Sequence, residues 1–313
     1  MRIAKHFDVD HLSSSTTLLF MGKASRRKKI DPAKRKAFRP QIPFVDRPYE
    51  GLVRESELVA MREIIPAATM TAHTNAEYGE SEITFVTLLP DGAGAMVRGD
   101  GVILIGLQTR FQSGDLSHDA GTAIAAALAM KDSGEEGVPQ FDVRDPGPRL
   151  QDVLVNEDSE PHLELVDNFS YWFDPEEEID EDTRAALEQN KDDIVATQVI
   201  SGVDNMYWCS MNNDFVRYVV DVDEDSLYTA LARLQVAGEA SFGPNSKFVG
   251  AFRACGIGIP VFQIEQGMAV SDLEEPAKKL QDALNAALDN DAPLSADERR
   301  VRSGMVSRQV TIR

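Results

Sequence analysis

The side chains best suited to chemistry lie in one short stretch, RFQSGDLSHD, which runs from residue 110 to residue 119. It joins an apolar run typical of a strand (101–107) to an apolar pattern typical of a helix that starts near Leu116. Free backbone amides at such a helix start can bind an anion. The polar side chains of the loop are Arg110, Ser113, Asp115 and His118. The loop is therefore a candidate site for a small ligand or an anion.

A simpler interpretation of the same loop is that Asp115 caps the helix and His118 faces solvent. A metal ion would need two or three converging His or carboxylate ligands, and this loop offers a single His. We therefore predict no metal site.

Other catalytic patterns are weak. The segment Gly238–Gly243 has the spacing of a phosphate loop, but Pro244 stands where such a loop needs Lys, and the segment follows a helix. Cys209 and Cys255 lie in apolar strand patterns and are expected to be buried thiols. No catalytic residue and no cofactor is predicted, and an enzymatic activity stays open.

The charge is divided unevenly along the chain. The whole protein has a net charge of −20, yet residues 21–40 carry nine basic residues and one Asp, a net charge of +8. Residues 41–313 carry 21 basic and 49 acidic residues, a net charge of −28. The basic residues of the arm are Lys23, Arg26, Arg27, Lys28, Lys29, Lys34, Arg35, Lys36 and Arg39. A cationic arm on an acidic body is expected to contact nucleic acid phosphates.

Residues 1–46 have few large apolar groups, and we expect them to be disordered. Met21, followed by Gly22, is expected to be the natural start of the chain. Two cysteines in 313 residues indicate a reducing compartment, and no apolar run is long enough to cross a membrane. We therefore expect a cytoplasmic protein.

The body is predicted to be α+β, with mainly antiparallel strand layers, flanking helices and two subdomains. The first unit, 47–133, has a helix around 57–65, strands at 82–89, 93–98 and 101–107 joined by hairpin turns, and a helix from Leu116. A connector rich in Gly, Pro and Asp covers 134–147.

The second unit, 148–313, is predicted to begin with a short helix at 149–155 and an aromatic strand at 169–173. An acidic run at 174–182 leads into a helix at 183–194, and strands at 196–201, 205–211 and 215–222 precede a helix ending at Gly238. A strand pair, a long amphipathic helix and a short helix capped by Ser295 follow. The basic residues of the C-terminal tail are Arg299, Arg300, Arg302, Arg308 and Arg313. They are expected to form internal ion pairs or, alternatively, a second phosphate-binding patch.

Several stretches together resemble an uncharacterised actinobacterial family of unknown function, whose members are often labelled SecA-like or topoisomerase. They are residues 47–69, 104–117, 147–154, 202–209 and 291–313. The resemblance covers nearly the whole body and implies no activity. A SecA-type label would imply a zinc-binding cysteine motif in the arm, but residues 26–29 there are Arg and Lys.

These observations favour a non-enzymatic binding protein that contacts RNA or the ribosome through its arm, with the acidic body available to a protein partner. The alternative is a small-ligand protein or enzyme that uses the Arg110–His118 loop. A role in protein export is a third possibility, which depends on the family label alone.

Overall fold

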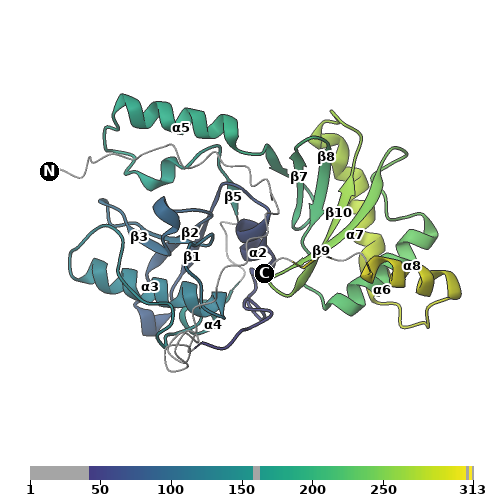
Figure 1. The fold of residues 1–313 in the computed structure, drawn as a ribbon, viewed down its shortest axis with the longest axis horizontal. Helices are drawn as coiled ribbons and strands as arrows, with labels where there is room; N and C mark the ends of the chain where they lie inside the picture. Colours follow the sequence, from purple (N-terminus) through teal and green to yellow (C-terminus); the bar gives the residue numbers. More distant parts are fainter. Residues whose placement is uncertain (1–41, 158–162, 308–309, 312–313) are drawn as a thin grey trace, which may run out of the picture. The chain divides into compact units, whose positions relative to one another are not determined.

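The computed structural model describes residues 42–157, 163–307 and 310–311. Its first sheet has the strand order β3–β4–β2–β1–β5. Figure 1 labels β1, β2, β3 and β5 of this sheet. The strands are β1 (Ala68–His73), β2 (Glu82–Val86), β3 (Ala95–Val97), β4 (Ile103–Gly106) and β5 (Glu164–Leu165). All pairings are antiparallel except the parallel pair β2–β4.

The hairpin predicted between the strands at 82–89 and 93–98 is wrong, because β4 lies between β2 and β3. Every residue of β4 is buried, which is typical of a central strand covered on both faces. The shorter β3 therefore lies at the edge of the sheet. The hairpin predicted for β3 and β4 is confirmed, with Val97 opposite Ile103.

Two helices complete the core of the first sheet. They are α2 (Glu55–Glu63) and α3 (Leu116–Asp132). Fully buried apolar residues of α2 join those of the sheet in one cluster, and α3 packs against β3 and β4. Both helices follow the predicted periodicity.

Part of the chain beyond the 134–147 connector also packs on the first sheet. The short helix α4 (Leu150–Val153) buries Leu150 and Val153 in its core, and β5 pairs with β1. The aromatic strand predicted at 169–173 is wrong. Residues Ser170–Trp172 form a 3-10 helix instead, in which the Trp172 indole donates a hydrogen bond to the Leu88 carbonyl at 2.8 Å. This side-chain contact anchors the segment without strand pairing.

The second sheet has the order β11–β9–β10–β8–β7–β6, antiparallel apart from the β11–β9 pair. Its strands are β6 (Thr197–Val199), β7 (Met206–Ser210), β8 (Asp214–Tyr218), β9 (Lys247–Ala254), β10 (Ile257–Gln263) and β11 (Val310–Thr311). Its helices are α6 (Glu224–Ala237), α7 (Glu274–Leu288) and α8 (Ala296–Val306). Apolar residues of the sheet and of these helices form a second core.

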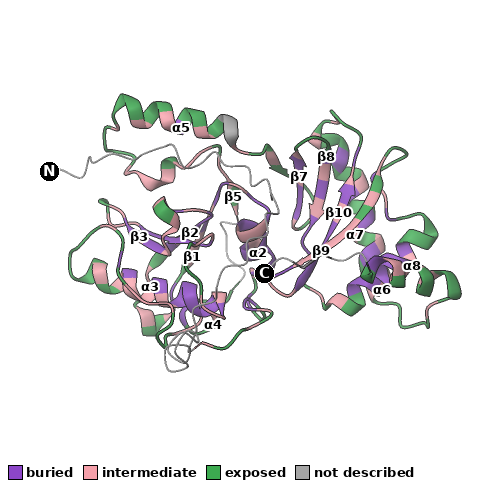
Figure 2. Cartoon of the chain, viewed as in Figure 1, coloured by how far each residue is buried: buried purple, intermediate pink, exposed green. Residues whose placement is uncertain are grey.

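The acidic run leads into α5 (Glu181–Asp193), which buries Leu187 and leaves most of its surface exposed (Figure 2). Mixed helices and mainly antiparallel strand layers confirm the α+β prediction. Among the described residues, no helix has the length and apolar content needed to cross a membrane.

Candidate functional site

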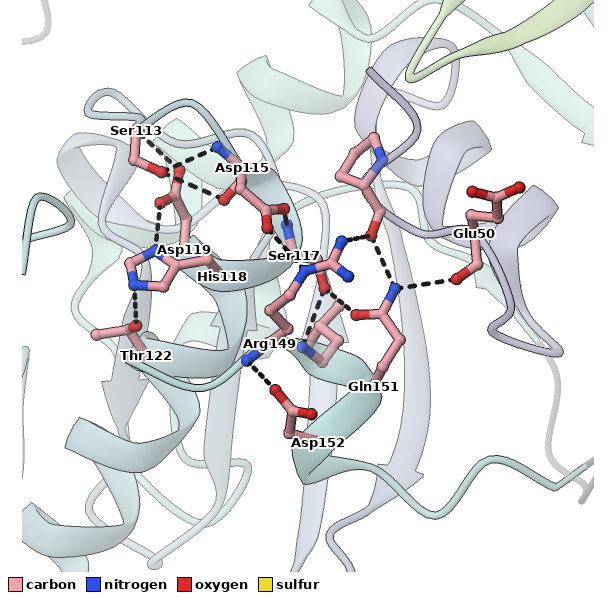
Figure 3. A network of polar contacts seen from close by, with 12 residues as sticks. Glu50, Ser113, Asp115, Ser117, His118, Asp119, Thr122, Arg149, Gln151 and Asp152 are labelled. Carbon is pink, nitrogen blue, oxygen red and sulfur yellow. Dashed lines mark hydrogen bonds and ion pairs between the residues drawn. The ribbon is translucent and has the colours of Figure 1, made fainter. Parts of the chain in front are cut away.

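Asp115 immediately precedes α3 and is buried, with 4% of its surface exposed. Its carboxylate accepts a hydrogen bond from the Ser117 amide at 3.0 Å, as an N-cap does. The same carboxylate accepts from Nε of Arg149 at 2.7 Å (Figure 3). The predicted capping role of Asp115 is confirmed, and Arg149 compensates the buried charge.

Ser117 is fully buried and joins α3 to α4. Its hydroxyl donates to Gln151 Oε1 at 2.5 Å and accepts from the Leu150 amide at 3.0 Å. The Gln151 side chain then donates to the carbonyls of Pro48 and Glu50 at 2.9 and 3.1 Å. The network thus fastens the beginning of the body to both helices.

His118 is also buried, with 3% exposed, so the interpretation that it faces solvent is wrong. Nε2 lies 3.0 Å from the Asp145 carbonyl oxygen, and Nδ1 lies 3.3 Å from Oδ1 of Asp119. Thr122 Oγ1 also lies 3.3 Å from Nε2. The second oxygen of Asp119 accepts from the Ser113 amide at 2.8 Å, which holds the loop against the helix.

Arg110 stands apart from this network. Arg110 is exposed, and its backbone amide donates to the Gly92 carbonyl at 2.9 Å. Its guanidinium carbon lies 5.7 Å from the centre of the Phe111 ring. The structure therefore brings together three of the four predicted loop residues, Ser113, Asp115 and His118, and leaves Arg110 on the surface.

The exposed side of the loop meets the beginning of the described chain. The Val45 amide donates to the Gly114 carbonyl at 2.8 Å. A Cβ at Gly114 would lie 2.7 Å from the Phe44 amide nitrogen and from Pro43 backbone atoms, so only Gly permits this approach. Phe44 and Phe111 are 69% and 71% exposed.

Sequence reasoning missed the role of Arg149, whose guanidinium compensates the buried carboxylate of Asp115. Asp115 and Arg149 are 34 positions apart, and no periodic pattern links them.

The nine basic arm residues, Lys23 to Arg39, lie outside the described residues, as do Arg308 and Arg313. Three other arginines of the C-terminal tail have partners inside the protein. Arg300 pairs with Asp297 at 2.9 Å, Arg302 contacts Asp225, and Arg299 donates to the Leu294 carbonyl. For Arg300 and Arg302, the prediction of internal ion pairing is confirmed.

The two cysteines are poorly suited to nucleophilic chemistry. Burial, with the nearby Glu63 carboxylate, raises the pKa of the Cys255 thiol to about 12. Burial also raises the pKa of Cys209. Within the described ranges, no three His, Cys, Asp or Glu side chains form a group that could hold a metal ion.

A cavity of about 580 Å³ lies away from the loop, between the ends of β7 and β8, α7 and residues 53–57. Tyr207, Tyr218 and Asp221 are among its lining residues, together with Gln281 of α7. The side-chain amide of Gln281 donates a hydrogen bond to the Asp204 carboxylate at 3.2 Å, and both residues line the cavity. The cavity contains none of the predicted loop residues.

The model of a family of unknown function (DUF5926) matches residues 48–313, so the chain belongs to that family. This confirms the predicted resemblance to a family of unknown function. No curated protein and no solved structure matches the chain. The matched region contains the whole polar network from Pro48 onward and excludes the basic arm.

Proposed function

We propose that this chain is a cytoplasmic, non-enzymatic binding protein that contacts RNA, including ribosomal RNA, through the basic arm Lys23–Arg39. The observation that carries the proposal is the separation of charge, +8 on the arm against −28 on residues 41–313. A body of that charge repels a polyanion, whereas an arm with nine cations gains affinity by releasing condensed counterions. The acidic body then remains available to a protein partner.

The described segment that follows the arm in sequence is bonded to the rest of the body. Asp46, shortly after the arm, pairs with Arg253 of β9, and Val45 is bonded to Gly114. The chain is thus fixed to the body a few residues after Arg39.

A small-ligand role for the Arg110–His118 loop has less support. The polar atoms of Ser113, Asp115 and His118 are hydrogen-bonded or ion-paired to partners inside the protein. Such an arrangement is typical of a structural network. Of the four predicted loop residues, only Arg110 has a side chain that could bind a ligand. The polar network is therefore assigned to holding the loop and the beginning of the body in place.

The test is co-sedimentation with RNA and with ribosomes at low salt. A full-length variant in which all nine basic arm residues become Gln should lose most of the binding, and wild-type binding should fall steeply as salt rises. The control replaces Lys278 and Lys279 of α7, both exposed, with Gln and should bind like the wild type. Equal binding by the arm variant and the wild type would contradict the proposal.

A further inference from the structure

The cavity at the end of the second sheet extends from one face of the sheet to the other. Tyr207 of β7 and Tyr218 of β8 both line it. Tyr218 lies opposite Met206, the neighbour of Tyr207, so the two tyrosine side chains point to opposite faces. Tyr207 accordingly belongs to the first core and Tyr218 to the second. The cavity volume of about 580 Å³ is typical of a small-molecule site, and its extent suits an elongated ligand.

Ser56 contributes a hydroxyl group without a hydrogen-bond partner to this cavity. The residue lies in the first turn of α2, lines the cavity and is only 7% exposed. Among the described residues, none forms a hydrogen bond with the Ser56 hydroxyl. A polar side chain that is so deeply buried is normally bonded to the protein, to ordered water or to a ligand. The hydroxyl is therefore available to a molecule in the cavity.

Two carboxylates that line the cavity have no ion-pair partner among the described residues. Asp204 accepts a hydrogen bond from the neutral amide of Gln281 at 3.2 Å. The Asp221 carboxylate accepts no hydrogen bond from a described residue. Arg47 donates to the Asp221 carbonyl, but its guanidinium makes two further hydrogen bonds to the Glu55 carboxylate. Both negative charges are therefore available to a cationic ligand.

The positions of these groups follow from their electrostatic effects on their neighbours. Burial raises the pKa of Tyr218, and the carboxylates of Asp204 and Asp221 raise it further, so both lie near its hydroxyl. Burial also raises the pKa of Glu55, the residue before Ser56, and the Asp221 carboxylate adds to this effect. The acceptor groups are thus distributed along the cavity, from the start of α2 past the end of β8.

The rest of the wall favours an organic cation. Valine and leucine side chains, including Val199, Val203 and Leu288, supply much of it. Among the described residues that line the cavity, Arg54 is the only basic one, and it lies 2.9 Å from the Glu57 carboxylate. Ammonium groups donate hydrogen bonds to carboxylates and hydroxyls, and carbon chains pack against apolar side chains. An anionic ligand would meet two unpaired carboxylates here.

We propose that this cavity binds a polyamine, an elongated aliphatic cation whose ammonium groups are separated by short carbon chains. The carboxylates of Asp204 and Asp221 accept hydrogen bonds from its ammonium groups, and the Ser56 hydroxyl supplies a further acceptor. The valine and leucine side chains pack against its carbon chains. This site uses no residue of the basic arm, so the proposal goes beyond RNA binding and is tested separately from it.

The experiment measures spermidine binding to the full chain by isothermal titration calorimetry at physiological ionic strength, where attraction between distant exposed charges is screened. The wild type should bind spermidine at a single site. Asp204→Asn and Asp221→Asn keep the side-chain shape and remove the charge, so each should weaken binding about tenfold. Ser56→Ala should weaken binding about threefold. It should leave the melting temperature of the free protein unchanged or higher, because the hydroxyl has no hydrogen bond to lose.

The matched control is Asp282→Asn, because Asp282 lies on α7 next to Gln281 but is exposed and does not line the cavity. It should bind spermidine like the wild type, and magnesium ions at equal concentration should not displace spermidine. An equal loss in Asp282→Asn, or displacement by magnesium, would show adventitious attraction to an acidic surface and overturn the proposal.

Three other results would also overturn it. They are no spermidine binding by the wild type, wild-type affinity in the three cavity variants, and a lowered melting temperature of Ser56→Ala, which would assign the hydroxyl a structural role. None of these results affects the proposed RNA binding, because the cavity variants leave every basic residue of the arm in place.

Discussion

Replacing Arg47 and replacing Glu55 in their ion pair are predicted to lower the free energy of unfolding by different amounts. Arg47 donates from Nε to Oε1 at 2.7 Å and from Nη2 to Oε2 at 2.8 Å, and the Glu55 side chain is only 2% exposed. Desolvation nevertheless raises the pKa of Glu55, although the hydrogen bond from Arg47 lowers it. Burial, together with the nearby carboxylates of Asp221 and Glu50, therefore costs the ionised form of Glu55 more free energy than the Arg47 guanidinium returns.

Arg47→Met leaves the carboxylate buried without its partner. Breaking a buried pair costs about 3–5 kcal/mol, and because the Arg47 side chain is 23% exposed we expect the lower end, about 3 kcal/mol. Glu55→Gln removes the charge that is costly to bury and keeps an acceptor oxygen for Arg47. We expect it to cost only about 1 kcal/mol.

The two variants should also differ in their dependence on pH. A carboxyl group with a higher pKa in the folded state than in the unfolded state keeps its proton longer when folded. The free energy of unfolding therefore falls as the pH rises from the unfolded pKa to the folded pKa. Arg47→Met removes the group that lowers the pKa of Glu55, so this interval widens. The variant should regain stability as the pH falls through it, and Glu55→Gln should lack that gain.

Urea unfolding followed by circular dichroism at several pH values measures both effects. The double variant closes the cycle and gives the coupling between the two residues. If Glu55→Gln costs as much as Arg47→Met near neutral pH, the carboxylate is not the costly partner and the reasoning is refuted.

Three further predictions concern other contacts. Gly114→Ala places a methyl group against the backbone of residues 43–44, so the Val45 amide should exchange its hydrogen faster, as measured by hydrogen exchange. Ser117→Ala leaves the Leu150 amide without its partner and should lower the free energy of unfolding by about 1–3 kcal/mol in chemical denaturation. Ser117→Thr keeps a hydroxyl at this position and tests whether the hydroxyl alone preserves stability. Cys255, with its pKa raised to about 12, should react with iodoacetamide at pH 8 far more slowly in the folded protein than in urea; equal rates would contradict the burial argument.

Local signals in the sequence predicted the element types well. The apolar periodicity of α3 and α6, the cap at Asp115, the capping box at Ser295 and the left-handed Gly238 all depend on residues within one or two turns of each other. The separation of charge is likewise a property of the sequence alone. For these reasons the sequence predicts the α+β class and the position of the basic segment.

The arrangement of the loop residues was decided by tertiary structure. His118 is buried because the Asp145 carbonyl, 27 residues later, reaches its ring, and Asp115 is compensated by Arg149 from α4. The order of β3 and β4 depends on which strand can be covered on both faces, and that is a property of the assembled sheet. The backbone of residues 43–44 approaches the loop closely only because Gly114 has no side chain. Contacts of this kind depend on chain closure over long separations, and short-range patterns contain no information about it.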